Sequence, residues 1–174
     1  MTNFSDEIFY LILDREVKIR GRYLRFSANV EGQMTRSVIL LNEVKTKRSG
    51  EEIRIDFKNF MFKQKLTKFQ SLLLEIYPDL SDFYAPLFIH IDTFREMRNK
   101  MAHCYFQWDE KNLDLVTIWD LDDSAGVQKM EPYQFTLKQI NKDLKQSMTD
   151  IIEELNNLSR EIVERVKPEI PHMF

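Results

Sequence analysis

An amphipathic stretch near the end of the chain constrains the fold more than any other feature of the sequence. Apolar residues recur every three or four positions from residue 137 to residue 166, which is the spacing of one helix face. Thr136 and Gln139 form a T-x-x-Q capping box before it, and Pro168 and Pro171 follow its end. The apolar positions are Leu137, Ile140, Leu144, Met148, Ile151, Leu155, Leu158, Ile162 and Val166. We expect this helix to pack into the chain's own core; the alternative is a helix-to-helix seam between two copies of the chain.

Helical spacing also dominates the first 45 residues. Two apolar groups are present, at Phe9, Ile12, Leu13 and Val17, and at Val30, Met34, Val38 and Leu41. Gly21 lies between them, so the pattern allows one helix or two. The charged segment Thr46–Glu52 contains a Ser-Gly pair and is expected to form a loop.

Two further helices are expected in the middle of the chain. Asp56 or Asn59 is placed to cap a helix that ends near Tyr77, before Pro78. Pro86 suits the first turn of the next helix. The apolar positions of these two helices are Phe62, Leu66, Phe69, Leu72, Leu73, Leu87, Ile91, Phe94, Met97 and Met101.

After His103 the pattern changes to one typical of strands. Tyr105–Trp108 and Leu113–Trp119 are rich in aromatic and β-branched residues and are joined by four polar residues, which predicts a hairpin. Asp120–Gly126 is a second loop candidate, and Val127–Phe135 is a candidate third extended segment. The fold class we predict is mainly α, an up-and-down helical bundle with a short β-hairpin before the last helix.

Length and composition fit one domain spanning residues 1–174. The formal net charge is −3, which gives no global electrostatic footprint for nucleic acid, although residues 1–108 are net positive and residues 109–174 net negative. Cys104 is the only cysteine, so no intramolecular disulfide can form, and a buried inert thiol is expected. The early apolar run Ile8–Leu13 is too short for a signal-peptide core or a membrane span. We therefore expect a reduced, cytoplasmic protein with no membrane partner.

Most sequence signatures of catalysis are missing. The chain has only four glycines and no phosphate-cradling loop, and it lacks the zinc-protease and nucleophile-elbow patterns. No cofactor or metal is expected, although Asp120, Asp122 and Asp123 leave a loop-bound cation as a minor alternative. His90 is expected in the core or at its edge, and His172 in the tail.

A run of cations between residues 45 and 68 is the most basic part of the chain. A solvated face is the simpler interpretation of such a run, and a surface that binds a polyanion is the alternative. The run contains Lys45, Lys47, Arg48, Arg54, Lys58, Lys63, Lys65 and Lys68.

The strongest candidate for chemistry is the end of the helix before the hairpin. Residues 98–103 read RNKMAH, with Arg98 and Asn99 five and four positions before His103. Cleaving RNA without a metal needs a proton acceptor for the 2′-OH and a proton donor for the leaving 5′-oxygen, and histidine suits both roles. Arginine supplies a fixed cation for the charge that develops on the phosphate. Asn99 lies one helical turn before His103, where it can orient the imidazole or hold a phosphate oxygen.

This R-N-x-x-x-H pattern, on a late helix of a small helical bundle, resembles the motif of the HEPN superfamily. The resemblance covers residues 20–166 in outline, but only the six-residue motif is specific. It implies a metal-independent endoribonuclease or an RNA-binding relative. It also implies a homodimer whose two motif helices face each other across a shared cleft, and a place in toxin–antitoxin or phage-defence systems, with an antitoxin or other protein as partner.

The candidate catalytic residues are therefore Arg98, Asn99 and His103, and the candidate supporting residues are Glu31, Arg95, Glu96 and Lys100. In the alternative interpretation, Asn99 and His103 only tie the helix to the hairpin, and Arg98 pairs with Glu31 or Glu96. The chain would then be a non-catalytic helical module that binds RNA, a nucleotide or a partner protein.

Helix geometry adds a constraint on this site. At 100° per residue, Arg98 and His103 lie about 140° apart around one regular helix, so they do not share a face. The sequence allows three solutions. The helix loosens near His103, the long Arg98 side chain reaches around, or the motif of a second subunit completes the site.

Overall fold

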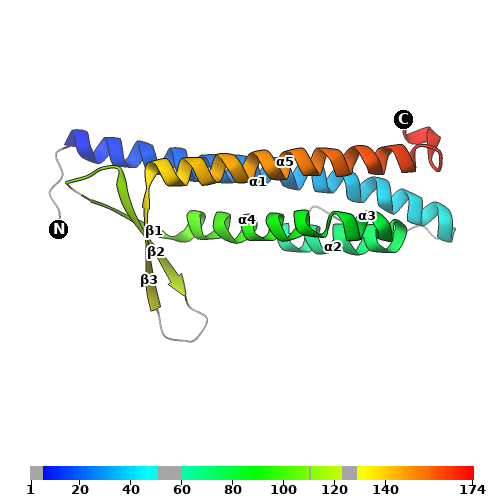
Figure 1. Ribbon diagram of the computed structural model, residues 1–174, viewed down its shortest axis with the longest axis horizontal. Coiled ribbons are helices and arrows are strands. Elements are labelled where there is room, and N and C mark those ends of the chain that lie inside the picture. Colours follow the sequence, from blue (N-terminus) through cyan, green and yellow to red (C-terminus); the bar gives the residue numbers. More distant parts are fainter. Residues whose placement is uncertain (1–5, 51–59, 110, 123–128) are drawn as a thin grey trace. The chain divides into compact units, whose positions relative to one another are not determined.

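The computed structural model describes residues 6–50, 60–109, 111–122 and 129–174, and the side chains of 120–122 and 129–131 are not described. These parts are mainly α-helical, with a small antiparallel sheet before the last long helix (Figure 1). The elements are α1 (Asp6–Ser49), α2 (Phe62–Ile76), α3 (Pro78–Phe83), α4 (Ala85–His103), β1 (Tyr105–Trp108), β2 (Leu115–Asp122), β3 (Lys129–Thr136), α5 (Leu137–Val166) and a final 3₁₀ turn (Pro171–Met173).

Helix α1 is a single helix of 44 residues, so Gly21 does not divide it. Gly21 is exposed and an added Cβ would meet nothing within 4 Å, so the residue serves no close packing. The helix persists because one buried stripe continues past the glycine, made of Ile19, Tyr23, Phe26, Val30, Met34, Val38, Leu41 and Val44. The loop predicted at Thr46–Glu52 is wrong for residues 46–49, because the helix continues to Ser49 and ends at Gly50, whose φ is 73°. Residues 51 and 52 lie outside the described residues.

The first apolar group of α1 is helical, as predicted, but it is not core. Phe9, Leu13 and Val17 are each exposed by 46% or more. The second group is fully buried, as the spacing predicts: Val30, Met34, Val38 and Leu41.

Helix α2 begins at Phe62, later than predicted. The residue before it, Met61, donates its backbone N–H to Gln64 Oε1 at 2.8 Å, so neither Asp56 nor Asn59, which both lie outside the described residues, is its cap. The predicted end is confirmed, because Tyr77 follows the helix and Pro78 opens the short helix α3. The predicted core positions are buried: Phe62, Leu66, Phe69, Leu72 and Leu73.

Helix α4 begins at Ala85, one residue before the predicted Pro86, and ends at His103. Its apolar stripe is buried at Leu87, Ile91, Phe94 and Met101. Met97 is an exception, because its side chain is 37% exposed.

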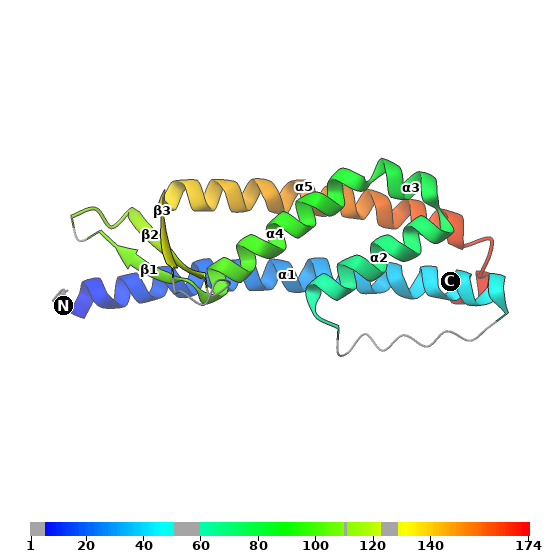
Figure 2. The ribbon, with the colours of Figure 1, turned by 90° about the horizontal axis from the view of Figure 1, so that it is seen from below.

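The strand region forms a three-stranded antiparallel sheet in the order β1-β2-β3 (Figure 2). The predicted hairpin is present, and the candidate extended segment Val127–Phe135 is confirmed from residue 129 onward as β3. Phe106 pairs with Ile118, and Ile118 pairs with Tyr133, so these three side chains share one face of the sheet. The second strand includes Asp120–Asp122, which the sequence analysis placed in a loop. The rest of that predicted loop, from 123 onward, lies outside the described residues.

Helix α5 starts as predicted. Gln139 N donates to Thr136 Oγ1 at 3.1 Å, and Thr136 N donates to Gln139 Oε1 at 3.3 Å, which is the capping box. The helix ends at Val166, before Pro168. Most of its stripe is buried by the chain itself, which supports the intramolecular core over a seam between copies: Ile140, Leu144, Ile151, Leu155, Leu158, Ile162 and Val166.

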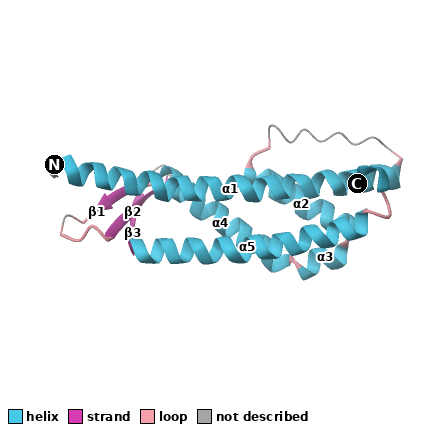
Figure 3. Ribbon diagram, turned by 90° about the horizontal axis from the view of Figure 1, so that it is seen from above, coloured by secondary structure: helices cyan, strands magenta, loops and turns pink. Residues whose placement is uncertain are grey.

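The contacts divide the chain into two compact units. We call Met1–Phe26 with Glu96–Ser147 the sheet unit, because it contains all three strands (Figure 3), and Ser27–Arg95 with Met148–Phe174 the helical unit. The prediction that residues 1–174 form a single domain stays a prediction. In the parts of the chain described here, no helix has an apolar stretch long enough to cross a membrane.

Ion pairs join the elements of the helical unit. Arg48 holds the carboxylate of Glu169 through Nε and Nη2, at 2.9 and 2.7 Å, and Tyr77 donates its hydroxyl to the same carboxylate at 2.8 Å. Arg165 holds Asp79 in the same two-bonded way, at 2.8 and 2.6 Å. Burial and the hydrogen bond to Glu169 raise the pKa of Tyr77 to about 12.

The cationic run of the sequence is partly neutralised within this unit. Lys45 pairs with Glu75 at 2.7 Å, and Lys65 pairs with Glu31 at 2.8 Å with only 18% of its side chain exposed. Arg48 is bound to Glu169, while Arg54 and Lys58 lie outside the described residues. The run therefore offers fewer free charges for a polyanion than its sequence suggests.

Candidate functional site

The last two turns of α4 carry the candidate motif, and they belong to the sheet unit. The helix is regular as far as His103, and the next residue, Cys104, donates its N–H to Lys100 O at 2.8 Å. A loosened helix near His103 is therefore excluded as the way to bring Arg98 and His103 to one face.

The side chain of Arg98 bonds to the next residue in the sequence. Its Nη1 donates to Asn99 Oδ1 at 2.8 Å. Asn99 and His103 are four residues apart and lie about 40° from each other around the helix axis. The bond to Asn99 therefore turns the Arg98 guanidinium toward the side of the helix that carries His103.

Arg98 retains hydrogen-bonding capacity. The side chain is half-buried, and among the described residues its Nε is fully buried without a hydrogen-bond partner. Asn99 is a neutral amide, so its bond leaves the charge of Arg98 uncancelled. This end of α4 thus holds a permanent cation that no carboxylate of the described residues neutralises, and such a cation suits an oxyanion.

His103 is exposed at the last position of α4. Its imidazole makes no hydrogen bond or ion pair to any residue in the described part of the chain. Both ring nitrogens are therefore open to a ligand or to solvent.

Arg20, from α1, fixes the end of the helix that carries His103. Its guanidinium donates from Nη1 to the carbonyl oxygens of Met101 and Ala102, at 2.7 and 3.0 Å, and from Nη2 to that of Cys104, at 2.9 Å. The carbonyls of Met101 and Ala102 belong to the last turn of α4, where carbonyls have no partner within the helix, and that of Cys104 follows directly after it. The same guanidinium lies 4.6 Å from the centre of the Phe106 ring, which joins the helix end to β1.

Two further polar side chains of α1 attach the strands. Trp108 Nε1 donates to Glu16 Oε1 at 3.0 Å, and Arg15 Nη1 donates to the carbonyl oxygen of Leu113 at 2.6 Å. Glu16 also approaches Arg20, at 4.0 Å. One face of α1 therefore holds both the end of α4 and the sheet that follows it.

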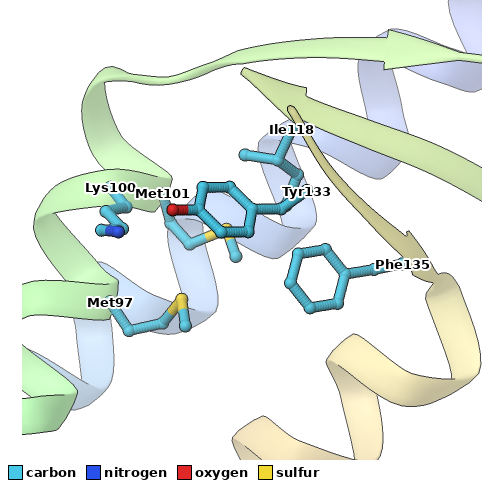
Figure 4. Close-up of a pocket in the computed structure, with 6 residues that line it drawn as sticks. All are labelled: Met97, Lys100, Met101, Ile118, Tyr133 and Phe135. Carbon is cyan, nitrogen blue, oxygen red and sulfur yellow. The ribbon is translucent and has the colours of Figure 1, made fainter. Parts of the chain in front are cut away.

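A pocket opens beside the motif, between α4 and the sheet (Figure 4). Its cavity volume is about 60 Å³, and about 340 Å³ is empty when the open solvent at the mouth is counted. The ring of Tyr133 lies between the two elements, with the Lys100 ammonium 5.0 Å from its centre. The lining residues are Met97, Lys100, Met101, Ile118, Tyr133 and Phe135.

The four candidate supporting residues fall into two groups. Lys100 and the exposed Glu96 lie with the motif in the sheet unit, whereas Glu31 and Arg95 belong to the helical unit. Glu31 is bound to Lys65, and Arg95 donates from Nε to Asp92 Oδ1 at 2.6 Å. The suggestion that Glu31 pairs with Arg98 is not supported, since Glu31 has its partner on α2.

The remaining candidate groups do not form a second catalytic or metal site in the part of the chain that the structure describes. Cys104 is buried, as expected of an inert thiol, whereas His90 is exposed rather than core. Among the described side chains, no three of His, Cys, Asp and Glu gather as metal ligands would. The cation alternative at Asp120, Asp122 and Asp123 involves side chains outside those described.

Sequence reasoning missed two contributors to this site, Arg20 and Glu16, and it did not single out a third, Tyr133. Arg20 and Glu16 act on residues more than eighty positions away, and no local pattern reports such contacts. Tyr133 is different, because its place in the candidate third extended segment made a sheet-face position foreseeable.

Comparison with known proteins found no match to the chain among protein-family models, curated proteins or solved structures.

Proposed function

We propose that this chain is a metal-independent endoribonuclease of the HEPN type, built on an up-and-down helical bundle. The observation that carries the proposal is the bond from Arg98 Nη1 to Asn99 Oδ1, which turns a permanent cation toward the helix face of an exposed His103. The three motif residues thereby offer a proton-transfer group, a phosphate-binding group and a positioning group on one helix end.

In the proposed reaction, His103 accepts the proton of a ribose 2′-OH. The 2′-oxygen then forms a bond to phosphorus, and the bond from phosphorus to the 5′-oxygen breaks. A second proton transfer, from an imidazolium, protonates that 5′-oxygen. The products are a 2′,3′-cyclic phosphate and a 5′-hydroxyl, and Arg98 stabilises the charge on the non-bridging oxygens.

The need for both a proton acceptor and a proton donor extends the proposal to a homodimer. One chain offers a single histidine at this end of α4, so the His103 of a second copy would supply the other role. Light scattering at assay concentration is expected to give the mass of a dimer. A fully active monomer would show that one imidazole performs both steps and that the dimer is not required.

The test is cleavage of labelled RNA in the presence of EDTA by the wild type and by His103→Ala. The variant is expected to lose about 10²- to 10⁴-fold in rate, the usual contribution of a general acid–base group. The matched control is His90→Ala, because His90 is also an exposed histidine of α4 but lies in the helical unit. His90→Ala should retain the wild-type rate and leave the same cyclic-phosphate ends.

Other outcomes are equally informative. Loss of cleavage on adding EDTA would overturn the metal-free mechanism. RNA binding without turnover would favour the non-catalytic module. A toxin or phage-defence role, with an antitoxin as partner, is an extension of the proposal and depends on cleavage being found first.

A further inference from the structure

The pocket between α4 and the sheet has a chemical character that the motif chemistry does not use. Tyr133 and Phe135 present aromatic rings from β3, and Met97 and Met101 present thioethers from α4. Aromatic rings and methionine side chains are favourable neighbours for a flat, polarisable ring. The one charged group in the lining is Lys100.

Two of the lining residues are also more exposed than side chains of the core. Met97 and Tyr133 are 37% and 39% exposed, whereas their lining neighbours Met101 and Ile118 are 2% and 3% exposed. The pocket therefore has an apolar floor and an accessible aromatic rim, which is the arrangement of a ligand site rather than of a packing defect.

Lys100 connects this pocket to the motif. It lines the pocket, with its ammonium 5.0 Å from the centre of the Tyr133 ring. It also lies three residues before His103, so the two side chains are about 60° apart around α4 and one turn apart along it. A ligand with a flat ring in the pocket and an anionic group beside Lys100 would extend toward His103.

We propose that this pocket binds a nucleobase of the RNA, next to the phosphate that is cleaved. The inference rests on the proposed function and deepens it, because it names the part of the substrate that the sheet unit recognises. The base lies against the rings of Tyr133 and Phe135, and Lys100 holds the adjoining phosphate. Because every base has a π-face, this contact gives affinity for unpaired RNA more than a choice of sequence.

The experiment uses the full chain and a fluorescent 12-nucleotide RNA whose 2′-oxygens are methylated, so that it binds without being cut. Single abasic substitutions are introduced at each position in turn, and the dissociation constants are measured by anisotropy. With the wild type, one abasic position is expected to weaken binding by about ten-fold, the scale of one base–aromatic stack. That position should flank the bond that the wild type cuts in the unmethylated RNA.

Variants connect this signal to the pocket. Tyr133→Ala should bind intact RNA about ten-fold more weakly and lose its sensitivity to that abasic position, because the stack is already absent. Tyr133→Phe keeps the ring and should restore both. The control is Tyr10→Ala, which removes a tyrosine that is 67% exposed on α1. In cleavage assays, Tyr133→Ala should raise KM more than it lowers kcat.

The outcomes separate this inference from the proposed function. If the wild type cleaves RNA but Tyr133→Ala keeps wild-type affinity and the same abasic profile, the nucleobase site is wrong and the ribonuclease stands. If the abasic signal depends on Tyr133 but unmethylated RNA is never cut, the site stands and the ribonuclease is wrong. If the wild type neither binds nor cuts RNA, both are wrong.

Discussion

In the helical unit, Arg48 and Arg165 each hold a carboxylate through two hydrogen bonds. In the sheet unit, Arg98 bonds to an amide oxygen, and Arg20 bonds to carbonyl oxygens with the carboxylate of Glu16 4.0 Å away. A two-bonded arginine–carboxylate pair satisfies both charges and fixes two elements to each other. An arginine that holds carbonyl or amide oxygens is equally well positioned but keeps its charge. Of these four arginines, Arg98 alone has no carboxylate partner among the described residues, so its charge remains available for an anion.

Removing the charge of Arg98 should have the largest effect, and on activity rather than stability. Arg98→Ala is expected to lower the rate of RNA cleavage by about 10²- to 10³-fold, the usual scale for one charge-stabilising group. Arg98→Lys should recover only part of that loss, because an ammonium lacks the planar fork. Single-turnover assays measure both variants.

The control for this prediction is Arg160→Ala, which removes an equally positive side chain from the exposed surface of α5. Equal losses of rate in Arg98→Ala and Arg160→Ala would mean that only the overall charge matters. The two regions would then not differ in the way proposed.

Arg20 tests the same comparison through stability. Arg20→Ala removes a charged donor from three carbonyl oxygens at the end of α4 and is expected to lower the free energy of unfolding by about 2–3 kcal/mol. Urea unfolding measures the change. Cleavage should also fall, because the segment that carries His103 is no longer held.

Arg22→Ala is the matched control, since Arg22 lies on the same helix but bonds only to the exposed Asn141. We expect its free energy of unfolding to change by less than about 0.5 kcal/mol. If Arg20→Ala is no more destabilising than Arg22→Ala, then the carbonyl contacts do not hold the end of α4.

Replacing Glu169 has the smallest expected effect on the free energy of unfolding, and that effect depends on pH. The hydrogen bond from Arg48 holds the pKa of the Glu169 carboxyl below its usual value near 4.5, with a further contribution from the Tyr77 hydroxyl and against the opposing effect of burial. A carboxyl whose pKa is lowered on folding stabilises the protein above the unfolded pKa, and this contribution disappears as the pH falls through the folded pKa. Glu169→Gln is therefore expected to cost about 1 kcal/mol at pH 7 and progressively less below pH 4.5.

Urea unfolding between pH 3 and pH 7 measures this dependence, with Glu164→Gln as an exposed control on α5. A constant difference between the wild type and Glu169→Gln at every pH would contradict the ionic role of Glu169. RNA cleavage at pH 7 should be unchanged in both variants, because neither residue belongs to the sheet unit.

The features that the sequence predicts well are those determined by neighbouring residues. The capping box of Thr136 and Gln139 needs three residues, and the buried stripe of α5 needs only helical spacing. The end of α2 before Pro78 follows from sterics within one dipeptide. The start of α4 is predicted to within one residue, because a proline in the first turn is itself a local signal.

The features that the sequence misses depend on partners far along the chain. Met97 fits the core stripe of α4 by spacing, yet it lines a pocket because Tyr133 and Phe135 leave space opposite it. Lys65 looks like a surface cation, yet Glu31 takes it mostly out of solvent. The RNKMAH pattern identifies which residues to examine, but the bond from Arg98 to Asn99 had to come from the structure.

The capping of α4 by Arg20 also has a consequence for the order in which the molecule assembles. The arginine and the carbonyls it holds are separated by 81 to 84 residues, so bringing them together costs more chain entropy than forming any local turn. Helices and the β1–β2 hairpin need only short loops and are expected to form earlier. During synthesis on the ribosome, Arg20 is made first, and its hydrogen bonds can form only after the whole of α4 has been synthesised. The candidate site would then be among the last parts to become ordered, and a nascent chain would lack a finished site until that contact closes.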